Sequence, residues 1–266
     1  MKTFRTACCI TVLAATSVFF LAGFSDVPVS ANNTAQTLPF SQAWTNVGLI
    51  TTNDDWAGVP GIVGYLGDIA ATTTTNVDPR TLLSDYSAVS AVDVIANQTN
   101  PDTLTNGGVA EFDGIANPAI ALNGSGTADA PHIIVYLNLT GQSNVHFACN
   151  IRDLDASADD AIQQIDVQYR VGATGDFTSV PGGYILDATT AGTATQVTPL
   201  NLTLPSAANN QANVQVRIMT TNAGGNDEWV GIDDISVTGG AAAPTQHHVD
   251  FDGNGKTDFA VVRNTG

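Results

Sequence analysis

Apolar and polar residues alternate over many short stretches between Phe40 and Gly239. Such alternation puts the apolar side chains on one face of a strand and is typical of strands that cover a core on one side. Gly, Asn, Asp, Pro and Thr separate the stretches, as expected of turns. The clearest predicted strands are residues 109–112, 132–139, 145–152, 165–171, 199–204, 214–219 and 229–237.

Helical signals in this region are few. Residues 79–85 predict a turn or two capped by Asp78, and residues 157–164 predict another short turn. No fixed-period repeat is visible, which argues against a solenoid or a complete propeller. Many short strands without long helices predict an all-β fold. We expect one domain over residues 40–239, a two-sheet antiparallel β-sandwich of the jelly-roll type.

The N-terminus has the layout of a secretory signal peptide. Lys2 and Arg5 precede an apolar run over residues 7–23, and Val29-Ser30-Ala31 offers the small residues that a signal peptidase reads. A retained membrane anchor is the alternative, but the run is short and lacks basic flanking residues on its far side. We expect a signal peptide over 1–31, a leader over 32–39, no transmembrane anchor after cleavage, and a secreted or cell-surface protein.

The amino-acid composition limits the classes of binding partner that the protein can have. The 266 residues include 8 basic and 25 acidic side chains, a formal net charge of −17. An acidic surface repels phosphate backbones, so we expect no direct binding of nucleic acid. Without the signal peptide, Cys149 is the sole cysteine, which leaves no internal disulfide. Its alternating neighbours predict a buried structural thiol.

An oxygen-rich loop near the C-terminus carries the strongest chemical signal. Side-chain oxygens recur at Asp250, Asp252, Asn254 and Asp258, and Lys256 stands where such loops offer a backbone carbonyl. Oxygen ligands at this spacing suit a hard cation, and Ca²⁺ best of all. We therefore predict a structural Ca²⁺ site, with a polar turn that holds no ion as the alternative.

The stretch from Val249 to Arg263, VDFDGNGKTDFAVVR, resembles the start of an FG-GAP/VCBS-type repeat, a family found in integrin-like propellers and secreted bacterial proteins. The resemblance implies a calcium loop followed by a strand. Residues 240–248 have linker composition, so 249–266 is expected to be a truncated repeat. A propeller needs several blades, and these residues supply less than one; the chain is then a fragment, or the piece is an appended loop.

Residues 40–239 resemble jelly-roll modules of large secreted bacterial proteins. The likeness is carried by YRVGA at 169–173 and by NDEWVGIDDISV at 226–237, which is similar to the last strand of concanavalin-like and MAM-type sandwiches. Modules of this kind also occur fused to extracellular nucleases and other hydrolases. The resemblance implies a binding or architectural role.

Acidic residues in the main domain suggest a second, weaker cation site. If the first and last strands pair, one sheet edge gathers the carboxylates of Asp54, Asp55, Asp227, Glu228, Asp233 and Asp234. Ca²⁺ would neutralise their repulsion, whereas the alternative is a set of solvated turn residues. Asp233 and Asp234 point to opposite faces, so at most one faces an ion. The acidic stretch 153–160 is interpreted first as a solvent-exposed loop and second as a weak cation site.

Trp56 is the best candidate for stacking on a sugar, because it lies in a Gly- and Asp-rich loop, although structural packing is the favoured interpretation for all three tryptophans. No catalytic motif is present, so we predict a non-enzyme. The expected function is extracellular binding or adhesion, or a Ca²⁺-stabilised scaffold, with a glycan or a surface protein as partner. The alternatives are an accessory N-terminal module of a secreted hydrolase such as a nuclease, a carbohydrate-binding domain, and a glycosidase that uses paired carboxylates.

Overall fold

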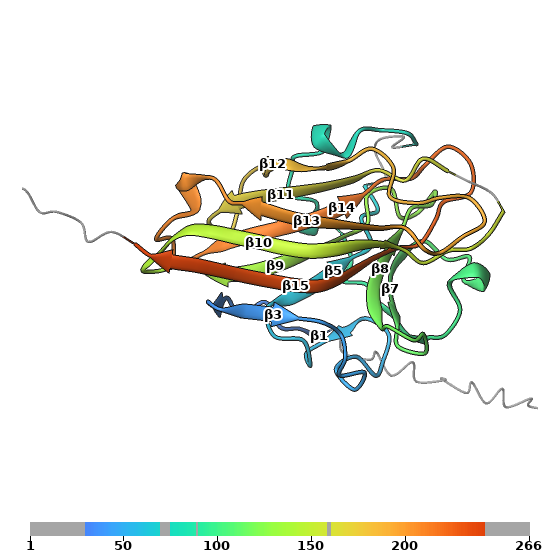
Figure 1. The fold of residues 1–266 in the computed structure, drawn as a ribbon, viewed down its shortest axis with the longest axis horizontal. Coiled ribbons are helices and arrows are strands. Elements are labelled where there is room, and N and C mark those ends of the chain that lie inside the picture. The colour runs from blue at the N-terminus through green and yellow to red at the C-terminus, as the bar shows by residue number, and fades with distance from the viewer. Residues whose placement is uncertain (1–29, 70–74, 89, 159–160, 243–266) are drawn as a thin grey trace, which may run out of the picture.

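The predicted all-β sandwich is confirmed by a computed structural model, which describes residues 30–69, 75–88, 90–158 and 161–242. Two large sheets pack face to face (Figure 1). The seven-stranded sheet has the order β13 (Val197–Thr203), β10 (Gln142–Asp153), β15 (Val230–Ala241), β8 (Ala119–Asn123), β7 (Gly108–Phe112) and β6 (Ile95–Gln98). Its remaining strand, β3 (Phe40–Gln42), pairs with β15. All seven strands predicted from the alternation are present, with ends shifted by a few residues.

The six-stranded sheet has the order β12 (Thr178–Ile185), β11 (Ile165–Val171), β14 (Val214–Thr220), β9 (His132–Asn138) and β2 (Gln36–Thr37), and β5 (Ile62–Tyr65) also pairs with β9. A small parallel pair joins β1 (Ser30–Ala31) to β4 (Asp55–Trp56). Four 3₁₀ turns complete the described elements: η1 (Pro79–Thr81), η2 (Tyr86–Ala88), η3 (Pro101–Thr103) and η4 (Ser206–Ala208). No helix within the described residues is long and apolar enough to cross a membrane.

The main core lies between the two sheets and follows the alternation of the sequence. On β10, the side chains of Val145, Phe147, Cys149 and Ile151 all enter it. Burial raises the pKa of the Cys149 thiol to about 12, so the buried, unreactive thiol predicted from its neighbours is the one observed.

The outer face of the six-stranded sheet is also buried, which the alternation alone did not predict. A segment of residues 75–88, here called the covering segment, lies across it and contains η1 and η2. The polar side chains of β11 and β14 that face away from the main core are therefore enclosed. Among them are Gln168, Gln215 and Arg217. Asp78 caps η1 by accepting from Arg80 N at 2.9 Å, as expected. The second predicted turn is absent from the described part of residues 157–164.

Candidate functional site

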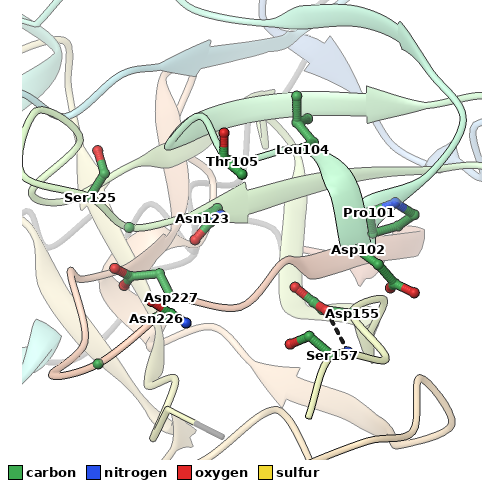
Figure 2. A pocket seen from close by; sticks show the side chains of 12 residues that line it. Pro101, Asp102, Leu104, Thr105, Asn123, Ser125, Asp155, Ser157, Asn226 and Asp227 are labelled. Atoms are coloured by element: carbon green, nitrogen blue, oxygen red, sulfur yellow. Dashed lines mark hydrogen bonds between the residues drawn. The ribbon is translucent and has the colours of Figure 1, made fainter. Parts of the chain in front are cut away.

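Loops from both sheets meet at one end of the sandwich and enclose a polar pocket of about 390 Å³, here called the end pocket (Figure 2). The loops are η3 with the residues after it, the β8–β9 connection, the segment that follows β10, and the β14–β15 connection. The lining residues are Pro101, Asp102, Leu104, Thr105, Asn123, Gly124, Ser125, Asp155, Ser157, Gly225, Asn226 and Asp227. Most of the side chains among them are polar, and none is Lys, Arg or His.

Two of the three lining carboxylates are fixed by the backbone of the loop after β10. Asp102 Oδ1 accepts from Ala156 N at 2.8 Å, which ties η3 to that loop. Asp155 Oδ1 accepts from Ser157 N at 2.8 Å, the contact drawn as a dashed line in Figure 2. Each carboxylate is thereby oriented without a positive charge beside it, since neither forms an ion pair within the described part of the chain.

Asp227 supplies the third carboxylate, from the β14–β15 connection. Its Oδ1 accepts from Ala223 N at 2.6 Å and lies against Gly124, where an added Cβ would come within 2.3 Å of this oxygen. Gly124 is therefore required for the close approach of the two loops. Burial raises the pKa of Asp227 to about 6, opposed by the Ala223 hydrogen bond.

Asn123, the last residue of β8, lies at the back of the end pocket and is only 5% exposed. Its Oδ1 is buried and receives no hydrogen bond from any described residue. Buried polar atoms are nearly always hydrogen-bonded in proteins, so an acceptor of this kind needs a donor from a ligand or solvent. Sequence analysis missed Asn123 because an asparagine at a strand end is the usual signal of a turn.

The last strand, β15, pairs with β3 near the start of the chain, but the predicted acidic cluster does not form within the described residues. Asp55 Oδ1 accepts from Ala57 N at 2.9 Å within its own turn. Asp54 Oδ1 accepts from Val94 N at 3.2 Å and so joins the loop before β4 to the residue before β6. Asp227 lies in the end pocket. In the described ranges no three His, Cys, Asp or Glu side chains are placed to hold a metal ion.

Asp233 and Asp234 differ from each other, as the alternation predicts. Asp233 is buried and accepts from Asn117 Nδ2 at 2.7 Å and from Arg152 Nη1 at 3.2 Å, so a guanidinium already supplies the positive charge that a cation would bring. Asp234 is exposed at a β-bulge, with φ at 50°, and accepts from Asn150 Nδ2 at 2.9 Å.

The favoured interpretation of Trp56 as a packed residue is confirmed and its candidacy for sugar stacking is excluded, whereas the interpretation of residues 153–160 is corrected. Trp56 is fully buried, donates its indole N–H to Asp93 O at 3.0 Å and packs edge-on against Trp44, so it has no face open to a sugar. The loop after β10 is not wholly solvated, because Asp153 and Asp155 are buried and their Oδ1 atoms accept backbone N–H groups. The predicted Ca²⁺ loop, Asp250 to Asp258, lies outside the described residues.

No family model and no curated protein matches the sequence. Among solved structures, a carbohydrate-binding module specific for non-crystalline cellulose is 12% identical with a TM-score of 0.35, over 49% of this chain and 80% of that one. A cleaved adhesin domain of Lys-gingipain from Porphyromonas gingivalis is 13% identical with a TM-score of 0.35, over 48% and 78%. A xylan-binding domain from Paenibacillus barcinonensis is 11% identical with a TM-score of 0.34, over 55% and 94%. The function is accordingly argued from the end pocket itself.

Proposed function

We propose that the protein is a secreted, non-catalytic glycan-binding module and that the end pocket is its binding site. One observation carries the proposal. Side-chain oxygens from four separate loops converge on one concave site, and one of them, Asn123 Oδ1, is buried without a donor. Ligand sites in proteins are usually concave, few in number and supplied with a small set of converging polar groups.

The chemistry of the lining suits a sugar. Each hydroxyl of a sugar donates one hydrogen bond and accepts others, and carboxylates or amides receive bonds from neighbouring hydroxyls. Asp102, Asp155 and Asp227 offer such acceptors around the pocket, whereas Pro101 and Leu104 offer apolar surface for the C–H groups of a ring. The volume of about 390 Å³ lies within the usual range for small-molecule sites.

Recognition would rest on hydrogen bonds and not on aromatic stacking. Trp44, Trp56 and Trp229 are all buried in the structure, and none of them lines the end pocket. Stacking on aromatic rings adds affinity beyond the area it buries, so its absence from the pocket favours modest affinity, with a dissociation constant on the order of 10 μM to 1 mM.

A binding role is favoured over glycoside hydrolysis because each lining carboxylate has one oxygen engaged with a backbone N–H. Hydrolysis needs one carboxylic acid that gives up its proton and a second carboxylate opposite it. Carboxylates that fasten loops are better suited to hold a ligand still. Sustained release of reducing sugar from any glycan that binds would contradict this part of the proposal.

The experiment is a binding screen of the secreted chain against immobilised oligosaccharides, followed by calorimetry on those that bind. Asp102→Asn keeps an acceptor for Ala156 N but removes a charge, and we expect it to weaken binding roughly five- to tenfold. The matched control is Asp176→Asn, an exposed acid on the turn between β11 and β12, at the other end of the sandwich. Binding that is equally affected by both substitutions, or no binding to any glycan, would contradict the proposal.

A calcium-stabilised C-terminal loop is a second proposal, supported by the spacing of the oxygen ligands from Asp250 to Asp258. Calorimetric titration of the whole chain with Ca²⁺ tests it. We expect one binding event that the double substitution Asp250→Ala, Asp252→Ala abolishes. Ca²⁺ binding that survives this double substitution would place the ion elsewhere.

A further inference from the structure

The lining of the end pocket is unbalanced in charge. Asp102, Asp155 and Asp227 bring three carboxylates, and no lining residue is basic. None of the three forms an ion pair with a Lys or Arg in the described ranges. Carboxylates held together without a cation repel one another, and the repulsion is relieved when a ligand brings positive charge.

Asn123 Oδ1 gives independent evidence for the kind of ligand. This atom belongs to a residue that lines the end pocket beside Asp227, is buried, and has no donor from any described residue. An ammonium group has three donors and no acceptor, so it matches a surface of acceptors better than a hydroxyl, which must also receive hydrogen bonds.

The cation is better supplied by an organic ligand than by a metal ion. No three acidic, histidine or cysteine side chains within the described residues are placed to enclose one ion. Figure 2 shows Asp102 and Asp155 on one side of the pocket and Asp227 across from them, next to Asn123. Carboxylates spread in this way around about 390 Å³ can contact several parts of one larger molecule.

We propose that the end pocket binds a glycan that carries a free amino group, such as the glucosamine units of deacetylated chitin. The inference rests on the proposed glycan-binding function and specifies its ligand class. Asp227 and Asn123 Oδ1 receive the ammonium hydrogens, whereas Asp102 and Asp155 receive hydroxyl hydrogens from the remainder of the sugar. A charge-assisted hydrogen bond is worth about twice a neutral one, so the amino group makes a large difference to affinity.

The pH dependence follows from the same arrangement. Burial raises the pKa of Asp227 to about 6, and the other titratable groups facing the pocket are the carboxyls of Asp102 and Asp155. An amine stays protonated below its own pKa, which for a simple α-amino group is about 8. Affinity should therefore fall as the pH drops from 7 to 5, because Asp227 loses its charge while the ligand keeps its own.

The test compares chitobiose, the glucosamine disaccharide with free amino groups, with N,N′-diacetylchitobiose by calorimetry on the secreted chain at pH 7. Disaccharides are chosen because a long polycation would adhere to any protein with a net charge of −17. We expect the amino form to bind at least tenfold more tightly than the acetylated form. Asp227→Asn should remove roughly this tenfold advantage, and Asn123→Leu should reduce it, while Asp176→Asn leaves it unchanged.

The outcomes separate this inference from the glycan-binding proposal. Equal affinity for the amino and acetylated disaccharides, both reduced by Asp102→Asn, overturns the amino-group inference and keeps glycan binding. Binding of the amino form that weakens as much with Asp176→Asn as with Asp227→Asn is non-specific attraction to an acidic surface, and also overturns it. Binding of neither disaccharide overturns the inference, and the glycan screen then decides the broader proposal. Thermal melting of each variant shows whether the substituted protein is folded.

Discussion

The outer face of the six-stranded sheet and the end pocket are both rich in enclosed polar groups, but they differ in how those groups are satisfied. On the sheet face, donors of the sheet meet acceptors of the covering segment. Arg217 donates to Ser84 O at 2.8 Å, to Leu82 O at 2.6 Å and to Gln168 Oε1. In the end pocket, three carboxylates have no basic residue among the lining, and Asn123 Oδ1 has no donor, as is also true of Asp166 Oδ1 on the sheet face.

The charged side chains of the two regions differ as well. Arg170 forms an ion pair with Asp85 of the covering segment at 2.5 Å, and its guanidinium lies over the ring of Phe177 at 4.4 Å. The Arg217 guanidinium lies over the same ring at 4.0 Å. The two arginines of the sheet face are therefore held by acceptors and rings of the protein, whereas the carboxylates of the pocket accept from backbone N–H groups. An unpaired buried acceptor does not by itself identify a ligand site, because Asp166 Oδ1 is one on the sheet face; the end pocket adds a concave lining with three carboxylates and no basic residue.

Removal of Arg217 should have the largest effect. Arg217→Met keeps most of the side-chain volume but leaves the carbonyls of Leu82 and Ser84 and the amide of Gln168 without their donor. We expect a loss of about 3–5 kcal/mol in the free energy of unfolding, measured with urea. Arg80→Met is the matched control, because Arg80 is an exposed arginine of the covering segment that forms one ion pair within the described residues, with Asp78 two positions away. Similar small losses in both variants would show that the covering segment is not held by Arg217.

How far the sequence predicted the molecule depends on the range of the interactions. The strands were predictable because alternation is local, and β10 follows it from Val145 to Ile151. The second buried face was not, because the polar residues of β11 and β14 are enclosed by a segment about 80 to 140 residues earlier in the chain. Packing was the favoured interpretation of Trp56 and is confirmed, although its turn-rich context does not reveal that Trp44 and Asp93 fold against it.

The end pocket contains one residue that sequence analysis singled out and others that it missed. Asp227 was singled out from the sequence as a ligand, although its expected neighbours were Asp54 and Asp233. Asn123 and Asp102 lack any local signal that separates them from ordinary turn and cap residues, since Asp102 belongs to a capped 3₁₀ turn. Only the topology, which places the end of β8 beside the β14–β15 connection, brings them together.

Two acids outside the pocket, the buried Glu111 and the half-buried Asp93, extend the comparison to the pH dependence of stability. Burial raises the pKa of Glu111 to about 7 and that of Asp93 to about 6. The folded state then binds protons more tightly than the unfolded state, so the free energy of unfolding should decrease by about 2–3 kcal/mol as the pH rises from 4 to 8. The double substitution Asp93→Asn, Glu111→Gln should flatten this decrease in urea unfolding curves. An unchanged slope would show that these acids remain solvated.

Substitution of Gly124 tests the close approach of the β8–β9 and β14–β15 connections, which shapes the pocket. A Cβ at this position would lie 2.3 Å from Asp227 Oδ1 and 2.5 Å from Asn222 Cα, so Gly124→Ala must push the β14–β15 connection away. We expect a loss of about 2 kcal/mol in stability, together with loss of glycan binding. Gly126→Ala is the matched control, since a Cβ there meets nothing within 4 Å. Full binding by Gly124→Ala would exclude Asp227 from the site.

Asp227→Asn should have the smallest effect on stability, and its sign distinguishes a ligand-binding acid from a structural one. Because burial raises the pKa of Asp227 to about 6, the charged form is disfavoured in the folded state. The neutral amide should therefore stabilise the protein at pH 8, by about 1 kcal/mol after allowance for partial exposure, and leave it unchanged at pH 4, where the carboxyl is already protonated in the folded state. Thermal melting at the two pH values measures the difference. A substitution that stabilises the fold while it weakens binding is the mark of a residue kept for its ligand; one that destabilises it at both pH values would assign Asp227 to the architecture of the loop, alongside the paired charges of the sheet face.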